Sequence, residues 1–128
     1  MKRFVALFGV MLLVLGLRMY NNGLLNCGYG GTWSYGEYDP VVMEELPLLI
    51  SGPHRLDLLG DEEIAMDIIN NLSGKVLWRE QIDDITIIYA YSPRVEEPVT
   101  VHGQKVNLMI AISGDRVSAG TPLLYGSY

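Results

Sequence analysis

The sequence predicts an α+β protein, with an apolar N-terminal helix followed by one amphipathic helix packed on a four-stranded antiparallel sheet. Three observations predict this class. The chain opens with an unbroken apolar run, residues 61–73 repeat apolar side chains at three- and four-residue steps, and after Gly74 the apolar period falls to two residues. We therefore expect a helix and then four strands that form an antiparallel meander.

The opening segment has the composition of a signal peptide or a membrane anchor. Lys2 and Arg3 precede an uncharged apolar run over residues 4–17, which Arg18 closes. A spanning helix needs about 20 apolar residues, so an anchor over residues 1–19 requires these cations to reach the lipid headgroups. The run leaves no polar face for solvent, which disfavours a soluble core helix. Cleaved signal and retained anchor both stay open, and we expect the rest of the chain to be extracytoplasmic, membrane-anchored or secreted.

Residues 20–45 are predicted to form a Gly/Tyr-rich tether ahead of an α+β domain over residues 46–128. Residues 20–39 hold five glycines and four tyrosines without an apolar period, a composition typical of a flexible linker. Cys27 is the single cysteine, which excludes an internal disulfide. The residues before it resemble a lipoprotein box only faintly, because Asn26 is bulkier than the small residue usual there. We favour an ordinary linker thiol.

The clearest helix follows residues 40–59, which show no clear period. Asp61 can accept hydrogen bonds from the free amides at the helix start, and Glu62 and Glu63 favour the positive end of the helix dipole. Gly74 suits the helix end. The predicted apolar face consists of Ile64, Ala65, Ile68, Ile69 and Leu72.

Four strands are predicted after this helix. They are residues 76–82, 85–91, 105–113 and 116–125. The first two are rich in β-branched and aromatic side chains, and Asp83 and Asp84 between them predict a hairpin turn. Pro122 has no amide hydrogen, so the last strand either lies at a sheet edge or breaks there.

Three segments near the C-terminus carry a family resemblance. They are Ala90-Tyr-Ser-Pro93, Gly103-Gln-Lys-Val-Asn-Leu-Met-Ile-Ala111, and Gly120-Thr-Pro-Leu-Leu124 with the terminal Tyr128. In order and spacing, residues 74–128 resemble the end of the YwmB family, small exported proteins of spore-forming Gram-positive bacteria with a fold like the TATA-box-binding protein. The resemblance implies export, a sheet with helices, a link to sporulation or the cell envelope, and no catalytic residues. This chain is shorter than that family, so we expect part of the family fold to be missing.

Composition argues against several kinds of chemistry. The chain beyond Cys27 contains 15 acidic and six basic residues, and this negative net charge repels nucleic acid. Adjacent acidic residues point to different sides of a helix or strand, so such pairs do not converge on a metal or substrate. We expect His54 to be a solvated loop residue rather than a metal ligand, and His102 to lie in a loop without a nucleophile motif. No catalytic residue, metal or cofactor is predicted.

Sheet geometry suggests a surface for protein contacts. A helix of about 13 residues covers about half of one face of a four-stranded sheet. We expect the opposite face to carry an apolar candidate interface made of Ile88, Ala90, Met109 and Ala111. Its expected occupant is a second copy of the chain or an envelope protein. The alternative is that residues 41–59 fold back and cover this face.

The predicted function is that of an exported or membrane-tethered accessory protein acting by protein contacts in the cell envelope, with a possible link to sporulation. Two alternatives stay open. A cell-envelope hydrolase requires a pocket where distant carboxylates or His102 converge. A small-ligand-binding module requires a concave apolar cavity between the helix and the sheet.

Overall fold

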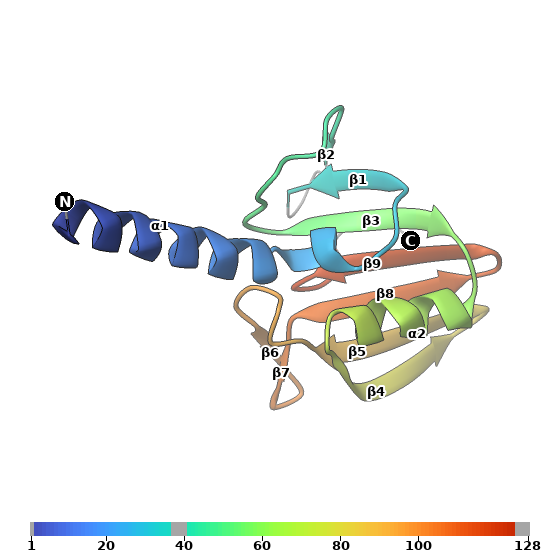
Figure 1. Cartoon of the computed structure of the whole chain (residues 1–128). Coiled ribbons are helices and arrows are strands. Elements are labelled where there is room, and N and C mark those ends of the chain that lie inside the picture. Colours follow the sequence, from blue (N-terminus) through green and yellow to red (C-terminus); the bar gives the residue numbers. More distant parts are fainter. Residues whose placement is uncertain (1, 37–40, 125–128) are drawn as a thin grey trace.

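A seven-stranded antiparallel sheet forms the centre of the computed structural model, which describes residues 2–36 and 41–124 (Figure 1). The strand order is β2-β1-β3-β9-β8-β5-β4. These strands are β1 (Thr32–Tyr35), β2 (Val41–Val42), β3 (His54–Leu59), β4 (Lys75–Ile82), β5 (Ile85–Tyr91), β8 (Leu108–Ser113) and β9 (Arg116–Thr121). A separate hairpin pairs β6 (Val99–Val101) with β7 (Gln104–Val106). The helices are α1 (Lys2–Tyr20), the short 3-10 helix η1 (Gly23–Asn26) and α2 (Glu62–Asn71).

The prediction of a four-stranded sheet is wrong, because three further strands come from residues 32–59. β3 pairs with β9 along its whole length, from His54 opposite Thr121 to Leu59 opposite Arg116, and β1 pairs with β3. β1 and β2 are four and two residues long, too short for a clear two-residue period. The chain is α+β but mostly β, and the segment expected to be a tether supplies part of the sheet.

Two predicted strands differ from expectation in their limits or position. The third is divided at Asn107, whose Oδ1 accepts from the Ser92 amide and whose Nδ2 donates to the Ser92 carbonyl, each at 2.7 Å. β7 ends at Val106 and β8 starts at Leu108, so the buried Asn107 lies between the two strands. The last predicted strand, β9, lies between β3 and β8 rather than at an edge. It ends at Thr121, directly before the proline, which is the predicted break at Pro122.

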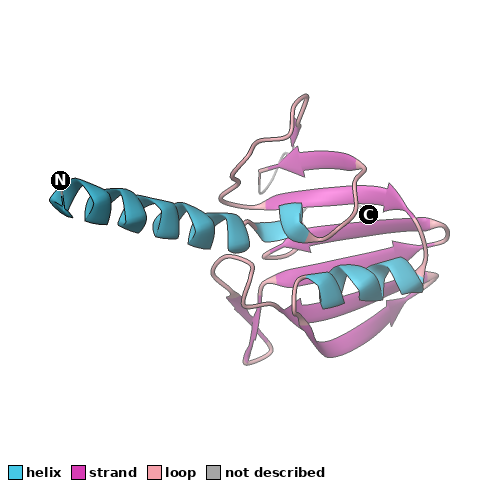
Figure 2. Cartoon of the chain, in the orientation of Figure 1, coloured by secondary structure: helices cyan, strands magenta, loops and turns pink. Residues whose placement is uncertain are grey.

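α2 packs on one face of the sheet (Figure 2). It begins as predicted, with the Asp61 carboxylate accepting a hydrogen bond from the Ile64 amide at 3.3 Å. The helix buries Ala65, Ile68 and Ile69. On this face the sheet and residues 24–27 contribute most of the rest of the main core, which includes Leu24, Cys27, Trp33, Leu56, Ile88, Ala90, Leu108, Ile110, Val117 and Ala119. The face that carries α2 is therefore the principal hydrophobic core.

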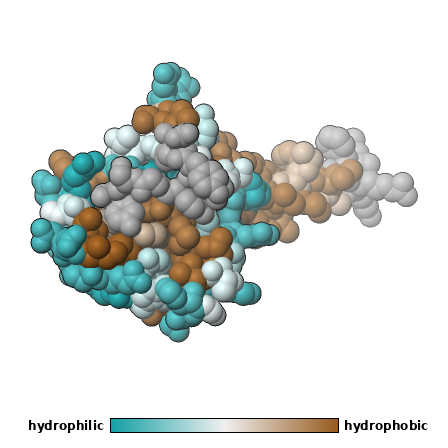
Figure 3. Space-filling view, turned by 180° about the vertical axis from the view of Figure 1, so that it is seen from behind, coloured by the Kyte–Doolittle hydropathy of each residue, from teal (hydrophilic) through white to brown (hydrophobic). Residues whose placement is uncertain are grey.

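The opposite face of the sheet is half apolar and half polar. Figure 3 views the molecule from this side. Its apolar half is a smaller cluster made of Ile87, Met109, Ala111 and Leu124, with Ile85, Tyr89 and Leu123 packed against it. Its polar half centres on Asp57, which accepts from Arg55 at 2.7 Å and from the Ser118 hydroxyl at 2.6 Å. Register places Ser118 beside Ala111, so the polar and apolar halves meet between β9 and β8.

α1 projects away from the sheet (Figure 1). From Val5 to Tyr20 every residue of this helix is exposed. Its exposed large apolar side chains include Val5, Leu7, Phe8, Val10, Met11, Leu12, Leu13, Val14, Leu15, Leu17 and Met19. Within the described ranges, no helix combines the length and apolar character needed to cross a membrane.

Candidate functional site

The candidate site is the junction where α1 meets the sheet, and Asn22 lies at its centre. The Asn22 side chain is buried, with its Nδ2 donating to the Leu48 carbonyl at 2.7 Å and its Oδ1 accepting from the Ile50 amide at 2.7 Å. One amide group thus satisfies two backbone groups of the loop between β2 and β3. These bonds fix that loop beside the residues that directly follow α1.

His54 forms a second connection between η1 and the sheet. The Leu24 amide donates to Nε2 of His54 at 3.0 Å, and Nδ1 lies 2.9 Å from the Gly52 carbonyl oxygen. Because a backbone amide can only donate, Nε2 is the acceptor and Nδ1 carries the proton that is donated to Gly52. Burial lowers the pKa of this imidazole below its ordinary value, which keeps it neutral.

The expectation of a solvated loop histidine at position 54 is therefore wrong. The side chain lies at the start of β3 and is 3% exposed. Gly23 allows η1 to approach so closely, since a Cβ there would lie 2.5 Å from the His54 ring. The sequence signal that was missed is the alternation from His54 to Leu58, in which every second side chain faces the core.

The C-terminal end of α1 is capped by side chains of the folded domain. Nδ2 of Asn26 donates to the carbonyls of Met19 at 2.7 Å and Tyr20 at 3.0 Å. Arg94 donates to the Tyr20 carbonyl at 3.3 Å and to the Asn71 carbonyl at 2.9 Å, and its guanidinium lies 4.2 Å from the centre of the Tyr20 ring. A cation at this end also suits the negative end of the helix dipole. These contacts join α1 to the domain in a defined orientation.

The residues after α1 form part of the core. Leu24 and Cys27 are fully buried, and burial raises the pKa of the Cys27 thiol. The linker setting expected for Cys27 is therefore wrong. Gly31 packs against β3 so closely that a Cβ would lie 2.3 Å from the Asp57 carbonyl oxygen. Gly31, like Gly23, therefore allows close packing where flexibility was predicted.

The four residues of the predicted interface do not share a face. Ile88 lies opposite Ile110 and belongs to the core under α2, as does Ala90. Met109 lies opposite Tyr89 and belongs to the smaller cluster on the other face, as does Ala111. All four are buried in this structure. The register of β5 against β8 is shifted by one residue from the alternation that we assumed, and a one-residue shift exchanges the two faces.

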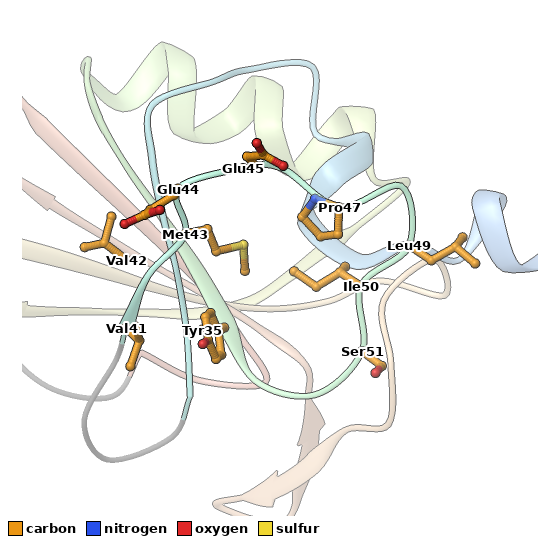
Figure 4. Close-up of a pocket in the computed structure, with 10 residues that line it drawn as sticks. All are labelled: Tyr35, Val41, Val42, Met43, Glu44, Glu45, Pro47, Leu49, Ile50 and Ser51. Carbon is orange, nitrogen blue, oxygen red and sulfur yellow. The ribbon is translucent and has the colours of Figure 1, made fainter.

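A groove opens beside β2, the strand at one edge of the sheet (Figure 4). Its volume is about 550 Å³. Figure 4 shows Tyr35, Met43 and Ile50 around the opening, with the carboxylates of Glu44 and Glu45 near its rim. Its other lining residues are Val41, Val42, Pro47, Leu49 and Ser51. An apolar groove with acidic groups at one side can accept an extended apolar segment that carries basic residues.

The remaining polar side chains show no catalytic arrangement among the described residues. His102 packs edge-on against Trp78, with 5.8 Å between ring centres, and Trp78 stacks on Tyr89 at 4.5 Å. Both ring nitrogens of His54 are occupied by backbone groups. In the described part of the chain, no three His, Cys, Asp or Glu side chains lie close enough together to hold a metal ion.

No family model matches this chain, and neither the curated proteins nor the solved structures contain a match to it. The resemblance of residues 74–128 to the YwmB family therefore rests on the three sequence segments alone and stays a prediction.

Proposed function

We propose that this chain is a membrane-tethered accessory protein that acts outside the cytoplasm through protein contacts. The observation that carries the proposal is the unpartnered apolar surface of α1, exposed from Val5 to Tyr20. Contact between so much apolar surface and water is unfavourable, and a contiguous patch of this kind marks a membrane or protein contact. Lys2, Arg3 and Arg18 at its two ends suit lipid headgroups.

The contacts at the end of α1 favour a retained anchor over a cleaved signal peptide. Asn26 and Arg94 both bind the last carbonyls of the helix. The segment beyond them is folded into the core through Leu24 and Cys27, so removal of α1 would break contacts that the folded domain makes with it. A link to sporulation rests on the YwmB resemblance alone.

The groove beside β2 is the protein-contact surface in this proposal. Among the described residues no further strand pairs with β2 on its outer side, and Tyr35, Val41 and Val42 are exposed there. A partner segment can add to such an edge as a further strand. Glu44 and Glu45 favour a segment with basic side chains.

A small-ligand-binding module is the second candidate, and the same groove favours it. Its volume of about 550 Å³ is in the range typical of ligand pockets. The groove lies at the sheet edge, however, and not between α2 and the sheet, where a ligand cavity was expected.

Cell fractionation of the full chain with a C-terminal tag tests the tether. We expect the tag in the membrane fraction, an intact mass that includes residues 1–18, and digestion of the domain by protease added from outside. An intact chain in the cytosol would contradict the proposal, whereas a secreted form without its first residues would support the signal-peptide alternative.

Peptide titration tests the contact surface independently. A peptide of alternating valine and lysine should shift the NMR signals of residues 41–43, and a valine–glutamate peptide should not. Equal effects of both peptides, or none, would remove the groove from the proposal.

A further inference from the structure

We propose that Leu46 and Leu48, in the loop over residues 46–49, form a second membrane contact and enter the lipid interface beside α1. The inference rests on the proposed membrane tether. The loop reads Leu-Pro-Leu-Leu, without charge, and projects two leucines into solvent. Leu46 is 55% exposed and Leu48 is 70% exposed.

The position of this loop follows from the Asn22 hydrogen bonds. Asn22 comes two residues after the end of α1, and it binds the backbone of both Leu48 and Ile50. The apolar loop is therefore fixed at the level where α1 enters the domain. Figure 1 shows the segment between β2 and β3 passing along the side of the body from which α1 projects. A membrane that holds α1 lies against this side.

The residues next to this loop at the end of α1 are of the types found at lipid interfaces. Tyr20 and Arg18 lie in the last turn of α1, and Tyr20 is exposed. Aromatic rings with a polar edge and long cationic side chains are enriched at the headgroup level. Exposed leucines at the same level gain by leaving water, since transfer of apolar surface out of water is favourable.

Charge selects the kind of lipid. Glu44 and Glu45 directly precede the loop, and the chain beyond Cys27 carries many more acidic than basic residues. Anionic headgroups repel such a surface, so the loop fits a zwitterionic lipid surface such as phosphatidylcholine.

Leu59 serves as the control for Leu48, because it lies at the end of the sheet far from α1. Leu59 is 74% exposed, which matches Leu48, and it ends β3. β3 starts beside the junction at His54 and runs away from α1 (Figure 1). Its length of about 17 Å keeps Leu59 well above the headgroups when α1 is in lipid.

The test uses the full chain with Leu48→Cys or Leu59→Cys, each labelled with an environment-sensitive dye and mixed with phosphatidylcholine vesicles containing a lipid-attached quencher. Native Cys27 is fully buried and should not take up the label, which a parallel reaction of the unsubstituted chain checks. Flotation of the vesicles reports attachment through α1 separately from the dye.

We expect both variants to float and the dye at position 48 to be quenched several-fold more than the dye at position 59. Floating protein with equally weak quenching at both positions would overturn the loop contact and leave the tether standing. Protein that fails to float would overturn both, and the flotation result identifies the tether as the part that failed.

Discussion

The backbone amide of Leu24 donates a hydrogen bond to Nε2 of His54 at 3.0 Å. The two residues are 30 positions apart, and this bond joins the helix that follows α1 to the start of β3. Protonation of Nε2 removes the acceptor and places a second donor against the Leu24 amide. The junction between α1 and the sheet therefore depends on a neutral imidazole.

Stability is predicted to decrease as pH falls below the ordinary histidine value of 6.5. Burial lowers the pKa of His54 in the folded state, so the unfolded chain binds a proton at a pH where the folded chain does not. The contribution of neutral His54 to the free energy of unfolding is fully present above about pH 6.5. It is lost as pH falls toward the lower pKa of His54 in the folded state. Urea unfolding in mild detergent at a series of pH values measures it.

Two histidine variants separate this effect from other titrations. His54→Gln should remove the pH-dependent decrease near pH 6.5. His102→Asn should retain it, because His102 is exposed and asparagine tolerates its positive φ of 49°. The same pH profile in His54→Gln as in the unsubstituted chain would show that another group is responsible.

Gly31→Ala is predicted to destabilise the domain by about 1–3 kcal/mol, the usual cost of overpacking. A Cβ at this position would lie 2.3 Å from the Asp57 carbonyl oxygen, which is backbone and cannot rotate away. Gly30→Ala is the matched control, because nothing lies within 4 Å of a Cβ there. It should change the free energy of unfolding by no more than about 0.5 kcal/mol. Equal effects from the adjacent glycines would mean that β1 is not packed against β3.

Asn22→Ala is predicted to cost about 1–3 kcal/mol for each buried backbone group that it leaves without a partner. Those groups are the Leu48 carbonyl and the Ile50 amide. The clearest measurement is hydrogen exchange at the Ile50 amide, which should accelerate strongly. Asn21→Ala provides the control, since Asn21 is exposed and adjacent. Unchanged exchange at Ile50 in the Asn22 variant would argue against the junction described above.

Cys27 is predicted to be unreactive in the folded protein. Its side chain has no exposed surface, and burial raises the pKa of its thiol, so little of the reactive thiolate forms. Mass spectrometry after maleimide treatment should show no addition in native protein and one addition in urea. Rapid native labelling would contradict the buried position, and a mass increase matching an acyl or diacylglyceryl group would indicate lipidation.

The elements with strong local patterns could be predicted from the sequence. α2 begins at the predicted capping residue, Asp61, and buries Ala65, Ile68 and Ile69 of its predicted apolar face. Ile64 is only partly buried, and the buried Leu72 follows the last residue of the helix. The hairpin of β4 and β5 turns at Asp83 and Asp84, where Asp83 adopts the positive φ of 52° that Asp tolerates. In both cases the information lies within about 15 neighbouring residues.

Elements defined by distant contacts could not be predicted in this way. Gly31 has the local appearance of a linker glycine. Only the close approach of the Asp57 backbone shows that no side chain fits at this position. The faces of Met109 and Ala111 depend on the register between β8 and β5, which no local pattern determines. The candidate site was missed for the same reason, because Asn22 and His54 bind partners about 30 residues away.

The central claim is that α1 belongs in lipid while residues 22–36 and 41–124 form a folded unit beside it. The most direct measurement is flotation of the full chain with phosphatidylcholine vesicles, compared with a Leu12→Asp, Leu13→Asp variant. Both side chains are exposed on α1, and each aspartate in apolar lipid costs roughly 2.5–3.5 kcal/mol. The account predicts that the unsubstituted chain floats and that the variant stays in solution with an unchanged sheet signal in circular dichroism. An unsubstituted chain that remains in solution as a monomer, or a variant that floats equally well, would contradict it.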